Sequence, residues 1–350
     1  MKVTFIPDYR NLNSYQTNLS NSISKQDVSI NFNLGSIIKY WKPDIVHIHW
    51  TYPYMIANSR LKTIIKSTSF ICVLIMLKLF GIKIVWTVHN IVDHEGKFRS
   101  TELFFTKFLA KLSNRMIVHC HAAKLEVIKV YGKDDSSVIV IPHGNYIGKY
   151  KNVMNSREAR NKFNINEEDT VFLYFGQIRA YKGIPELIDA FNKLENKKAK
   201  LFIVGKPLDE DIVIKILSNR NGNIETVLKF IPDDDIQIYM NAADIVVLPF
   251  KDILTSGSAI LSMSFGKPII APEVGCITET VDKKGSFLYS TEKAEKTENG
   301  LLDAMQTVLG TDRMILMDMG RYNFRLVEQF GWDGVGKKTY SLYQECIADK

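Results

Sequence analysis

Two cationic side chains, Arg179 and Lys182, lie in a short turn that is bounded by Gly176 and Gly183. A guanidinium can hold phosphate oxygens through two donors, and an ammonium adds a compact positive charge. For an arbitrary basic pair, a solvated loop is the ordinary alternative. The elements on either side of the turn decide between the two interpretations.

The turn is expected to join a strand to a helix. Residues 171–175 are β-branched or aromatic, as in a buried strand. Pro185 suits the first turn of a helix, and apolar residues then recur at helical spacing as far as Leu194. Because the amides and the dipole at the start of a helix favour an anion, the sequence predicts a phosphate-binding turn.

The composition indicates a globular protein with two domains. The chain has 350 residues, of which 46% are hydrophobic and 24% charged, and this excludes disordered, collagen-like and disulfide-scaffold proteins. Four scattered cysteines favour a reducing compartment. Residues 1–6 begin directly with a strand-like run, where a secretion signal would need a charged and then an apolar region. We therefore expect a cytoplasmic protein.

The net charge of +7 predicts an anionic partner. The apolar run 70–80 is about half as long as the ~20 residues of a membrane span. With the cations around it and the basic, aromatic segment 104–111, it could lie on an anionic membrane at the inner face of the cell membrane. A core helix with a solvated basic edge is the alternative. Nucleic-acid binding is disfavoured, because no basic stripe is interleaved with exposed aromatic residues.

Strands alternate with helical stretches along the whole chain, which predicts an α/β fold with two doubly wound parallel sheets. The first half, residues 1–148, has expected strands at 3–7, 44–49, 82–89, 117–119 and 138–141. The second, residues 149–330, has them at 171–175, 200–204, 226–230, 245–249, 268–271 and 286–289. No G-x-G-x-x-G follows the first strand, which disfavours a dinucleotide-binding enzyme.

Two further boundaries are expected outside these strands. A linker after residue 148 should lead into a short helix that is capped at Ser156. A helix within 331–350 should cross back and pack on the first domain. Ligands gather at the carboxyl ends of parallel strands, so the natural site is a cleft between the two sheets.

Several motifs resemble those of GT-B glycosyltransferases of family four. In the second half they are residues 175–183, 201–205, 243–249 and 264–272. In the first half, residues 86–90 (Trp-Thr-Val-His-Asn) resemble the strand-end histidine motif of that family, and residues 140–144 resemble its crossing between domains. The resemblance implies two Rossmann-like domains that face a cleft, the first binding the acceptor and the second the nucleotide sugar.

The resemblance also implies roles for the glycine-bounded turn. Arg179 and Lys182 would neutralise the diphosphate of the donor, and Gly176 would let its phosphates approach the backbone. The family usually has an arginine directly after this glycine, where the present chain has Gln177. The role of the guanidinium is therefore assigned to Arg179.

Two other positions take their roles from the same resemblance. His89 would contact the transferred sugar. Glu279 matches a glutamate that follows the next glycine-rich turn of the family, and it would bind the ribose or base side of the nucleotide.

The sequence departs from the family between residues 250 and 266. Most members carry two glutamates eight positions apart, and Ile253 and Leu261 occupy those positions here. The hydroxyls and amides of Ser256, Gly257 and Ser258, at the start of a probable helix, could bind phosphate instead. The change resembles a branch of the superfamily that acts in surface-polysaccharide assembly.

The catalytic base depends on the stereochemistry. If the reaction inverts the anomeric centre, a base must take the acceptor proton, and the candidates are Asp93, Glu95 and Asp8. If it retains the configuration, no such base is needed and His89 mainly positions the sugar. A surface carboxylate is the ordinary alternative for each acid, and His94 lies in the same cluster.

No catalytic metal and no cofactor besides the nucleotide sugar is expected. His47 and His49 are expected to face opposite sides of one strand, so that they pack rather than share a metal ion. The acidic run 233–235 precedes apolar residues at helical spacing, and acids at the start of a helix complement its dipole.

The sequence thus predicts a metal-independent hexosyltransferase. The donor would be GDP-mannose or a UDP-hexose, and the acceptor a glycolipid or a polysaccharide in surface-polysaccharide biosynthesis. A sugar-nucleotide epimerase or hydrolase of the same fold is one alternative. A noncatalytic subunit that binds sugar nucleotides is another.

Overall fold

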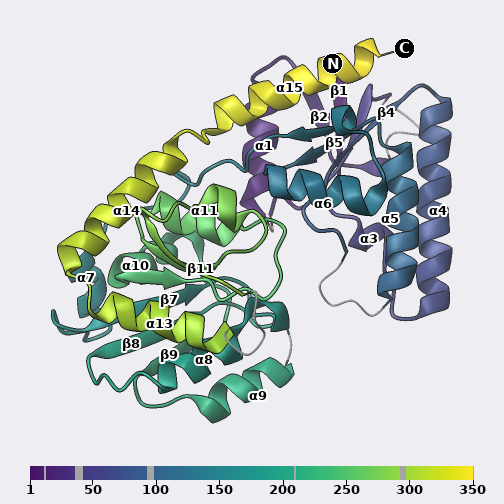
Figure 1. Ribbon diagram of the computed structural model, residues 1–350. Helices are drawn as coiled ribbons and strands as arrows, with labels where there is room; N and C mark the ends of the chain where they lie inside the picture. Colours follow the sequence, from purple (N-terminus) through teal and green to yellow (C-terminus); the bar gives the residue numbers. More distant parts are fainter. Residues whose placement is uncertain (12, 36–41, 93–97, 209, 292–296, 350) are drawn as a thin grey trace. The chain divides into compact units, whose positions relative to one another are not determined.

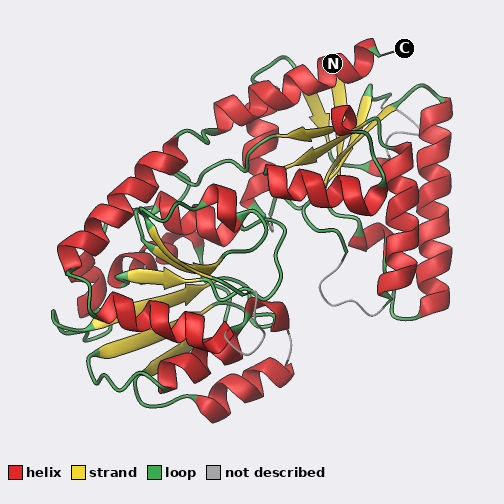
Figure 2. Cartoon of the chain, in the orientation of Figure 1, coloured by secondary structure: helices red, strands yellow, loops and turns green. Residues whose placement is uncertain are grey.

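The computed structural model describes residues 1–11, 13–35, 42–92, 98–208, 210–291 and 297–349. The chain divides into two compact units (Figure 1). The first contains Met1–Gly144 and Phe330–Lys350, and the second contains Asn145–Gln329. Strands alternate with helices in each (Figure 2).

Among the described residues, the first unit has a six-stranded parallel sheet in the order β2-β1-β3-β4-β5-β6. Its strands are β1 (Lys2–Ile6), β2 (Ser29–Asn31), β3 (Ile45–Ile48), β4 (Lys83–Thr87), β5 (Arg115–Val118) and β6 (Val138–Val140). The strand order reverses between β1 and β3. The loops after these two strands therefore lie where parallel sheets bind ligands.

Helices cover both faces of this sheet. The helices α4 (Arg60–Leu79), α5 (Arg99–Leu112) and α6 (His121–Tyr131) precede β4, β5 and β6, and right-handed crossovers in one direction place them on one face. The helix α1 (Ser14–Ser24) packs against α15 (Trp332–Ala348), as Figure 1 shows. The Ser22 hydroxyl donates to the Trp332 carbonyl at 2.6 Å. The last helix of the chain is thus part of the first unit. A short helix, α3 (Tyr52–Met55), follows β3.

The second unit also has six parallel strands among its described residues, in the order β12-β11-β10-β7-β8-β9. They are β7 (Thr170–Phe175), β8 (Ala199–Val204), β9 (Ile224–Val227), β10 (Ile245–Val247), β11 (Ile269–Pro272) and β12 (Ser286–Tyr289). Here the order reverses between β7 and β10, so the loops after these strands are the expected ligand site.

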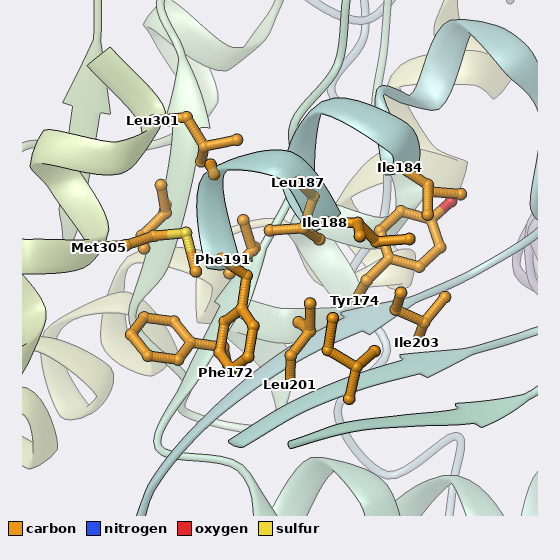
Figure 3. Close-up of a cluster of buried hydrophobic side chains, with 14 of the residues drawn as sticks. Phe172, Tyr174, Ile184, Leu187, Ile188, Phe191, Leu201, Ile203, Leu301 and Met305 are labelled. Atoms are coloured by element: carbon orange, nitrogen blue, oxygen red, sulfur yellow. The ribbon is translucent and has the colours of Figure 1, made fainter. Parts of the chain in front are cut away.

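The core of the second unit lies between the sheet and two helices, α8 (Ile184–Asn192) and α13 (Thr297–Leu309). Leu187, Ile188 and Phe191 of α8 point onto Phe172 and Leu201 of the sheet (Figure 3). The expected helical spacing therefore marks a buried face. The remaining helices are α7 (Ser156–Asn161), α9 (Glu210–Asn219), α10 (Ile236–Ala242), α11 (Gly257–Ser264), α12 (Ile277–Thr280) and α14 (Arg313–Glu328).

The expectation of two Rossmann-like parallel-sheet domains is confirmed, and two local expectations are corrected. The edge strand β2 was not expected, because its three residues, Ser-Ile-Asn, are mostly polar. The cap of α7 is Asn155 rather than Ser156. The Asn155 side chain accepts from the Glu158 amide, and the Glu158 carboxylate accepts from the Asn155 amide. This reciprocal pair needs a glutamate three residues after the cap, which only Asn155 has.

Candidate functional site

The turn after β7 is held by its own backbone. Gly176 has φ 148° and lies against Gly205, where an added Cβ would be 1.8 Å from the Gly176 carbonyl oxygen. The Tyr174 hydroxyl donates to the Gln177 carbonyl at 2.7 Å. The Ile178 amide donates to the Lys206 carbonyl at 3.0 Å. These bonds fix the backbone of the turn that carries Arg179.

The same turn is fastened to the segment after β10. Gly183, which precedes α8, has φ 71°, and a Cβ there would lie 1.8 Å from the Pro249 carbonyl oxygen. The Lys251 amide donates to the Tyr181 carbonyl at 3.0 Å. Any side chain at position 183 would push these segments apart. The turn is thereby placed at the point where the strand order reverses.

Lys182 lies in the short helix η2 (Ala180–Lys182) with its ammonium 4.2 Å from the centre of the Phe250 ring. Burial, and then the nearby Arg179, lower the pKa of Lys182 to about 7. Among the described residues, no carboxylate forms an ion pair with this ammonium. A partly buried cation without an acidic partner is suited to an anionic ligand that supplies the missing charge.

The start of α11 reaches the same turn. A Cβ on Gly176 would lie 3.2 Å from the Ser258 hydroxyl oxygen, which shows how closely the two segments approach. Ser256 accepts from the Ala259 amide at 3.1 Å, so its hydroxyl caps the helix. The first amides of a helix have no partner within it. The structure thus brings Gly176 close to Ser258.

The positions that carry glutamates in most of the family are occupied by buried apolar side chains. Ile253 precedes α11 and Leu261 lies within it, and they are 6% and 9% exposed. Neither can contribute charge or a hydrogen bond to a ligand. Any polar contact in this region must come from neighbouring residues such as Ser258.

Glu279 lies in the short helix α12, and it is exposed. The turn before α12 contains Gly275, whose φ is 51° and where a Cβ would lie 1.9 Å from the Ile253 carbonyl oxygen. Because α12 follows β11, the neighbour of β10, Glu279 belongs to the same edge of the sheet.

The first unit holds a second candidate region, which we call the histidine cluster. Its five histidine rings surround the Tyr15 ring or stack on one another, with ring centres 4.2–6.0 Å apart; they are His47, His49, His89, His119 and His143. His89 follows β4 and stacks on Trp50 at 4.5 Å with an angle of 9° between the rings. Helix α1 thus supplies Tyr15 as the aromatic centre of the cluster, which the sequence motifs did not indicate.

Burial lowers the pKa of every histidine in the cluster. The pKa is about 3 for His47 and His143 and about 4 for His119. It is well below the usual value for His49 and His89, where burial is the main cause and neighbouring histidines add to it. The rings are therefore neutral at pH 7. In the described part of the chain, His89 Nε2 has no hydrogen-bond partner, so this neutral ring can bond to a ligand.

The expectation that His47 and His49 face opposite sides of β3 is wrong. Their ring centres are 4.2 Å apart, because residues two apart in a strand share a face. His47 bonds to the Tyr343 hydroxyl at 2.5 Å and to the Thr87 hydroxyl at 2.7 Å, which fits the expected packing role. Within the described residues, no group of three metal-binding side chains is arranged around an ion.

Of the three carboxylates expected as a base, only Asp8 lies among the residues that the structure describes. Asp8 follows β1 and accepts two bonds of 2.9 Å from the Arg10 guanidinium. This pairing is the main reason that the pKa of Asp8 is lowered, which makes it a weaker base. Asp93 and Glu95, with His94, lie outside the described residues.

A carboxylate that the sequence analysis missed lies beside His89. Glu102, in the first turn of α5, is only 4% exposed. It lines a cavity of about 30 Å³ together with His49, Trp50, His89 and Asn90. Its spacing from Phe105 and Leu109 places it on the buried face of α5. A single acidic residue on an apolar helix face is the sequence pattern that could have identified Glu102. Glu102 is thus a candidate base.

Comparisons with known proteins agree with this arrangement. Residues 155–312 match the family "Glycosyl transferases group 1", and residues 10–145 match "Glycosyltransferase Family 4". A GDP-mannose:glycolipid 4-beta-D-mannosyltransferase of Xanthomonas campestris pv. campestris is 25% identical over 314 residues, which cover 87% of this chain and 80% of the relative.

Two solved structures share the fold. Sucrose-phosphate synthase from Thermosynechococcus elongatus has a TM-score of 0.78 at 17% identity, covering 100% of this chain and 99% of the other. Anabaena HepE in complex with UDP-glucose has a TM-score of 0.75 at 14% identity, covering 99% of this chain and 100% of the other.

Proposed function

Because the chain belongs to the GT-B glycosyltransferases of the family-four type, we propose that it transfers a hexose from a nucleotide-diphosphate sugar to a lipid-linked or polysaccharide acceptor. GDP-mannose is the first candidate donor, supported by the similarity to a GDP-mannose:glycolipid mannosyltransferase. A UDP-hexose is the second, since a relative in fold holds UDP-glucose. The acceptor belongs to surface-polysaccharide biosynthesis.

The main support for this proposal is the turn that contains Gly176, Arg179 and Lys182, in which Gly176 approaches Ser258. In the reaction, an acceptor hydroxyl oxygen bonds to the anomeric carbon while the bond from that carbon to the phosphate oxygen breaks. The nucleoside diphosphate leaves with the bonding electrons. Arg179 and Lys182 stabilise the charge that grows on this leaving group, so the transfer needs no metal ion. Activity in the presence of a chelator tests that part.

Residues of the first unit are proposed to bind the transferred sugar and to accept the proton of the acceptor hydroxyl. We propose that His89, neutral in its cluster, donates or accepts a hydrogen bond to the transferred sugar rather than acting as an acid. If the reaction inverts, Glu102 takes the proton of the acceptor hydroxyl, since it is buried and lines the same cavity as His89. Glu279 binds the ribose or base side of the nucleotide.

A lipid-linked acceptor is held in a membrane, so we propose that the protein works in the cytoplasm at the inner face of the cell membrane. The acceptor sugar then reaches the histidine cluster, where Trp50 and Tyr52 offer aromatic rings near His89. Such rings are common linings of sites for small ligands.

Thermal stabilisation by GDP-mannose, UDP-glucose and their free diphosphates tests the donor, because a ligand that binds the folded state raises its stability. The expected result is stabilisation by one nucleotide series and sugar transfer to a lipid-linked acceptor. Release of nucleoside diphosphate without an acceptor would instead favour a hydrolase or epimerase. Binding with no turnover on any acceptor would favour a noncatalytic subunit. Absence of stabilisation by all nucleotides would contradict the proposal.

A further inference from the structure

The helix α4 has two apolar faces. One faces the interior of the first unit and includes Phe70, Leu74 and Leu77. The other faces solvent, and its large apolar side chains are 39–83% exposed; they are Leu61, Ile64, Ile65, Ile75 and Leu79. A surface helix usually has a single apolar stripe toward the core. The second, exposed apolar stripe of α4 therefore indicates a binding partner outside the unit.

The neighbouring helix α5 adds aromatic rings to this surface. Phe104 and Phe108 are 56% and 43% exposed, and their ring centres are 5.0 Å apart. The two helices pack side by side in one layer on the sheet (Figure 1). The Lys78 ammonium of α4 donates to the Leu112 carbonyl of α5 at 2.8 Å. Helices in one layer present their outward sides in the same direction, so the two stripes form a common outer surface.

The charges on this outer surface have one sign. Six exposed cations come from the two helices: Arg60, Lys62, Lys66, Arg99, Lys107 and Lys111. The helix α4 contains no acidic residue, and the acid of α5, Glu102, is 4% exposed. An outer surface that combines apolar and aromatic side chains with unopposed cations matches the boundary of a bilayer with negatively charged headgroups.

We infer that α4 and α5 dock the protein onto an anionic lipid bilayer. The 20 residues of α4 extend roughly 30 Å, and the helix lies in the plane of the interface because its inner face stays packed on the unit. In the described part of the chain, no helix combines the length and the apolarity needed to cross a membrane. The docking is thus peripheral.

Charge argues against a second copy of the chain as the occupant. A two-fold dimer would place the same surface of both copies face to face. The cations of one copy would then lie opposite the cations of the other, without acids to compensate them. A bilayer of anionic lipids supplies the opposite charge.

Vesicle co-sedimentation of the full chain, without donor or acceptor, tests the inference. We expect binding to phosphatidylglycerol vesicles that exceeds binding to phosphatidylcholine vesicles by roughly tenfold or more and falls as salt is added. Reversing two cations, with Lys62→Glu and Lys107→Glu, should lower the partition coefficient by roughly tenfold or more. Replacing two exposed apolar side chains, with Ile65→Ser and Leu79→Ser, should lower it by a similar factor.

The matched control reverses the same amount of charge elsewhere, with Lys197→Glu and Lys229→Glu, two exposed lysines of the second unit. Equal loss in this control, or equal binding to both kinds of vesicle, would overturn the inference. So would a dimer, seen by sedimentation velocity, that Ile65→Ser abolishes. The inference rests on the proposed function in one respect: a lipid-linked acceptor is the reason for the protein to bind a membrane. Because the assay contains no donor, docking and transfer can fail separately.

Discussion

Burial lowers the pKa of Lys182 in the glycine turn of the second unit and of the histidines in the cluster of the first, but the consequences differ. In the turn it lowers the pKa of Lys182 to about 7, so the side chain is still partly charged at neutral pH. In the cluster it lowers the pKa of His47 and His143 to about 3, and these bases are fully neutral. The turn can therefore bind an anion, whereas the cluster offers neutral rings.

The difference follows from what surrounds each group. Lys182 lies over the Phe250 ring and near a second cation, and only a bound anion would restore its usual pKa. The histidines lie against one another and against Tyr15, so a charged ring would lose its hydration, and a second charged ring would be repelled by the first. A diphosphate fits the first environment. A sugar hydroxyl fits the second.

The largest expected effect is that of acid, which should destabilise the first unit. The folded pKa values of the five histidines lie below the unfolded value of about 6.5, so the unfolded state binds more protons as the pH falls. At pH 5.5 each buried histidine should cost about 1.4 kcal/mol, and the cluster several kcal/mol. Urea unfolding at pH 7.5 and 5.5 measures the loss.

His47→Gln should reduce this pH dependence, because it removes one of the buried bases. His121→Asn, at an exposed position of α6, should leave it unchanged. Equal stability at both pH values would show that the cluster is not buried in the neutral form.

Removing the cations of the turn should have the next largest effect. Arg179→Ala or Lys182→Ala should lower kcat/KM by about 10²–10³-fold, because the leaving diphosphate loses a stabilising charge. Steady-state kinetics with the donor identified by thermal stabilisation measures this. Lys229→Ala, at an exposed position of the same unit, is the control. Unchanged turnover in either variant would end the assignment of a phosphate site.

Glu102→Gln should affect the first unit alone, and it therefore separates acceptor activation from donor binding. If Glu102 is the base of an inverting transfer, kcat should fall by about 10²-fold while the dissociation constant of the donor stays the same. The rise of the rate with pH, which reports the base, should disappear. Glu126→Gln, at an exposed position of α6, should change neither value. A lower melting temperature without loss of kcat would indicate a purely structural carboxylate.

Donor binding should depend on pH by a smaller factor. A diphosphate raises the pKa of Lys182 in the complex, so binding takes up a proton above pH 7. The dissociation constant should be constant below pH 7 and rise by up to about tenfold per pH unit above it. Calorimetry with the intact nucleotide sugar measures this. Lys182→Arg should bind without that dependence, because a guanidinium stays charged. A flat profile in the unchanged protein would argue against contact between Lys182 and the diphosphate.

The fold and the turn could be predicted because both are local patterns. Buried strands such as 171–175 are continuous apolar runs bounded by polar residues. Gly176, Arg179 and Lys182 lie within seven residues of one another, so a strand, a turn and a helix in sequence are enough to place them together. Edge strand β2 lacks such a run and was missed.

The histidine cluster and Glu102 were harder to predict because distant segments create them. His47 and His143 are far apart in the sequence, and they join the same cluster only because the strands of the first unit pair into one sheet. The role of Ser258 likewise depends on contact with Gly176, 82 residues earlier in the chain, which no local motif encodes.

From its residues alone, this chain specifies two α/β domains and a cationic turn between a strand and a helix. These follow from hydrophobic periodicity and from the backbone freedom of glycine, which act over a few neighbouring residues. Tertiary structure decided which groups lose water and which charges face them. It thereby set the neutral state of the histidines, the lowered pKa of Lys182 and the buried position of Glu102, because desolvation depends on every segment that packs around a group.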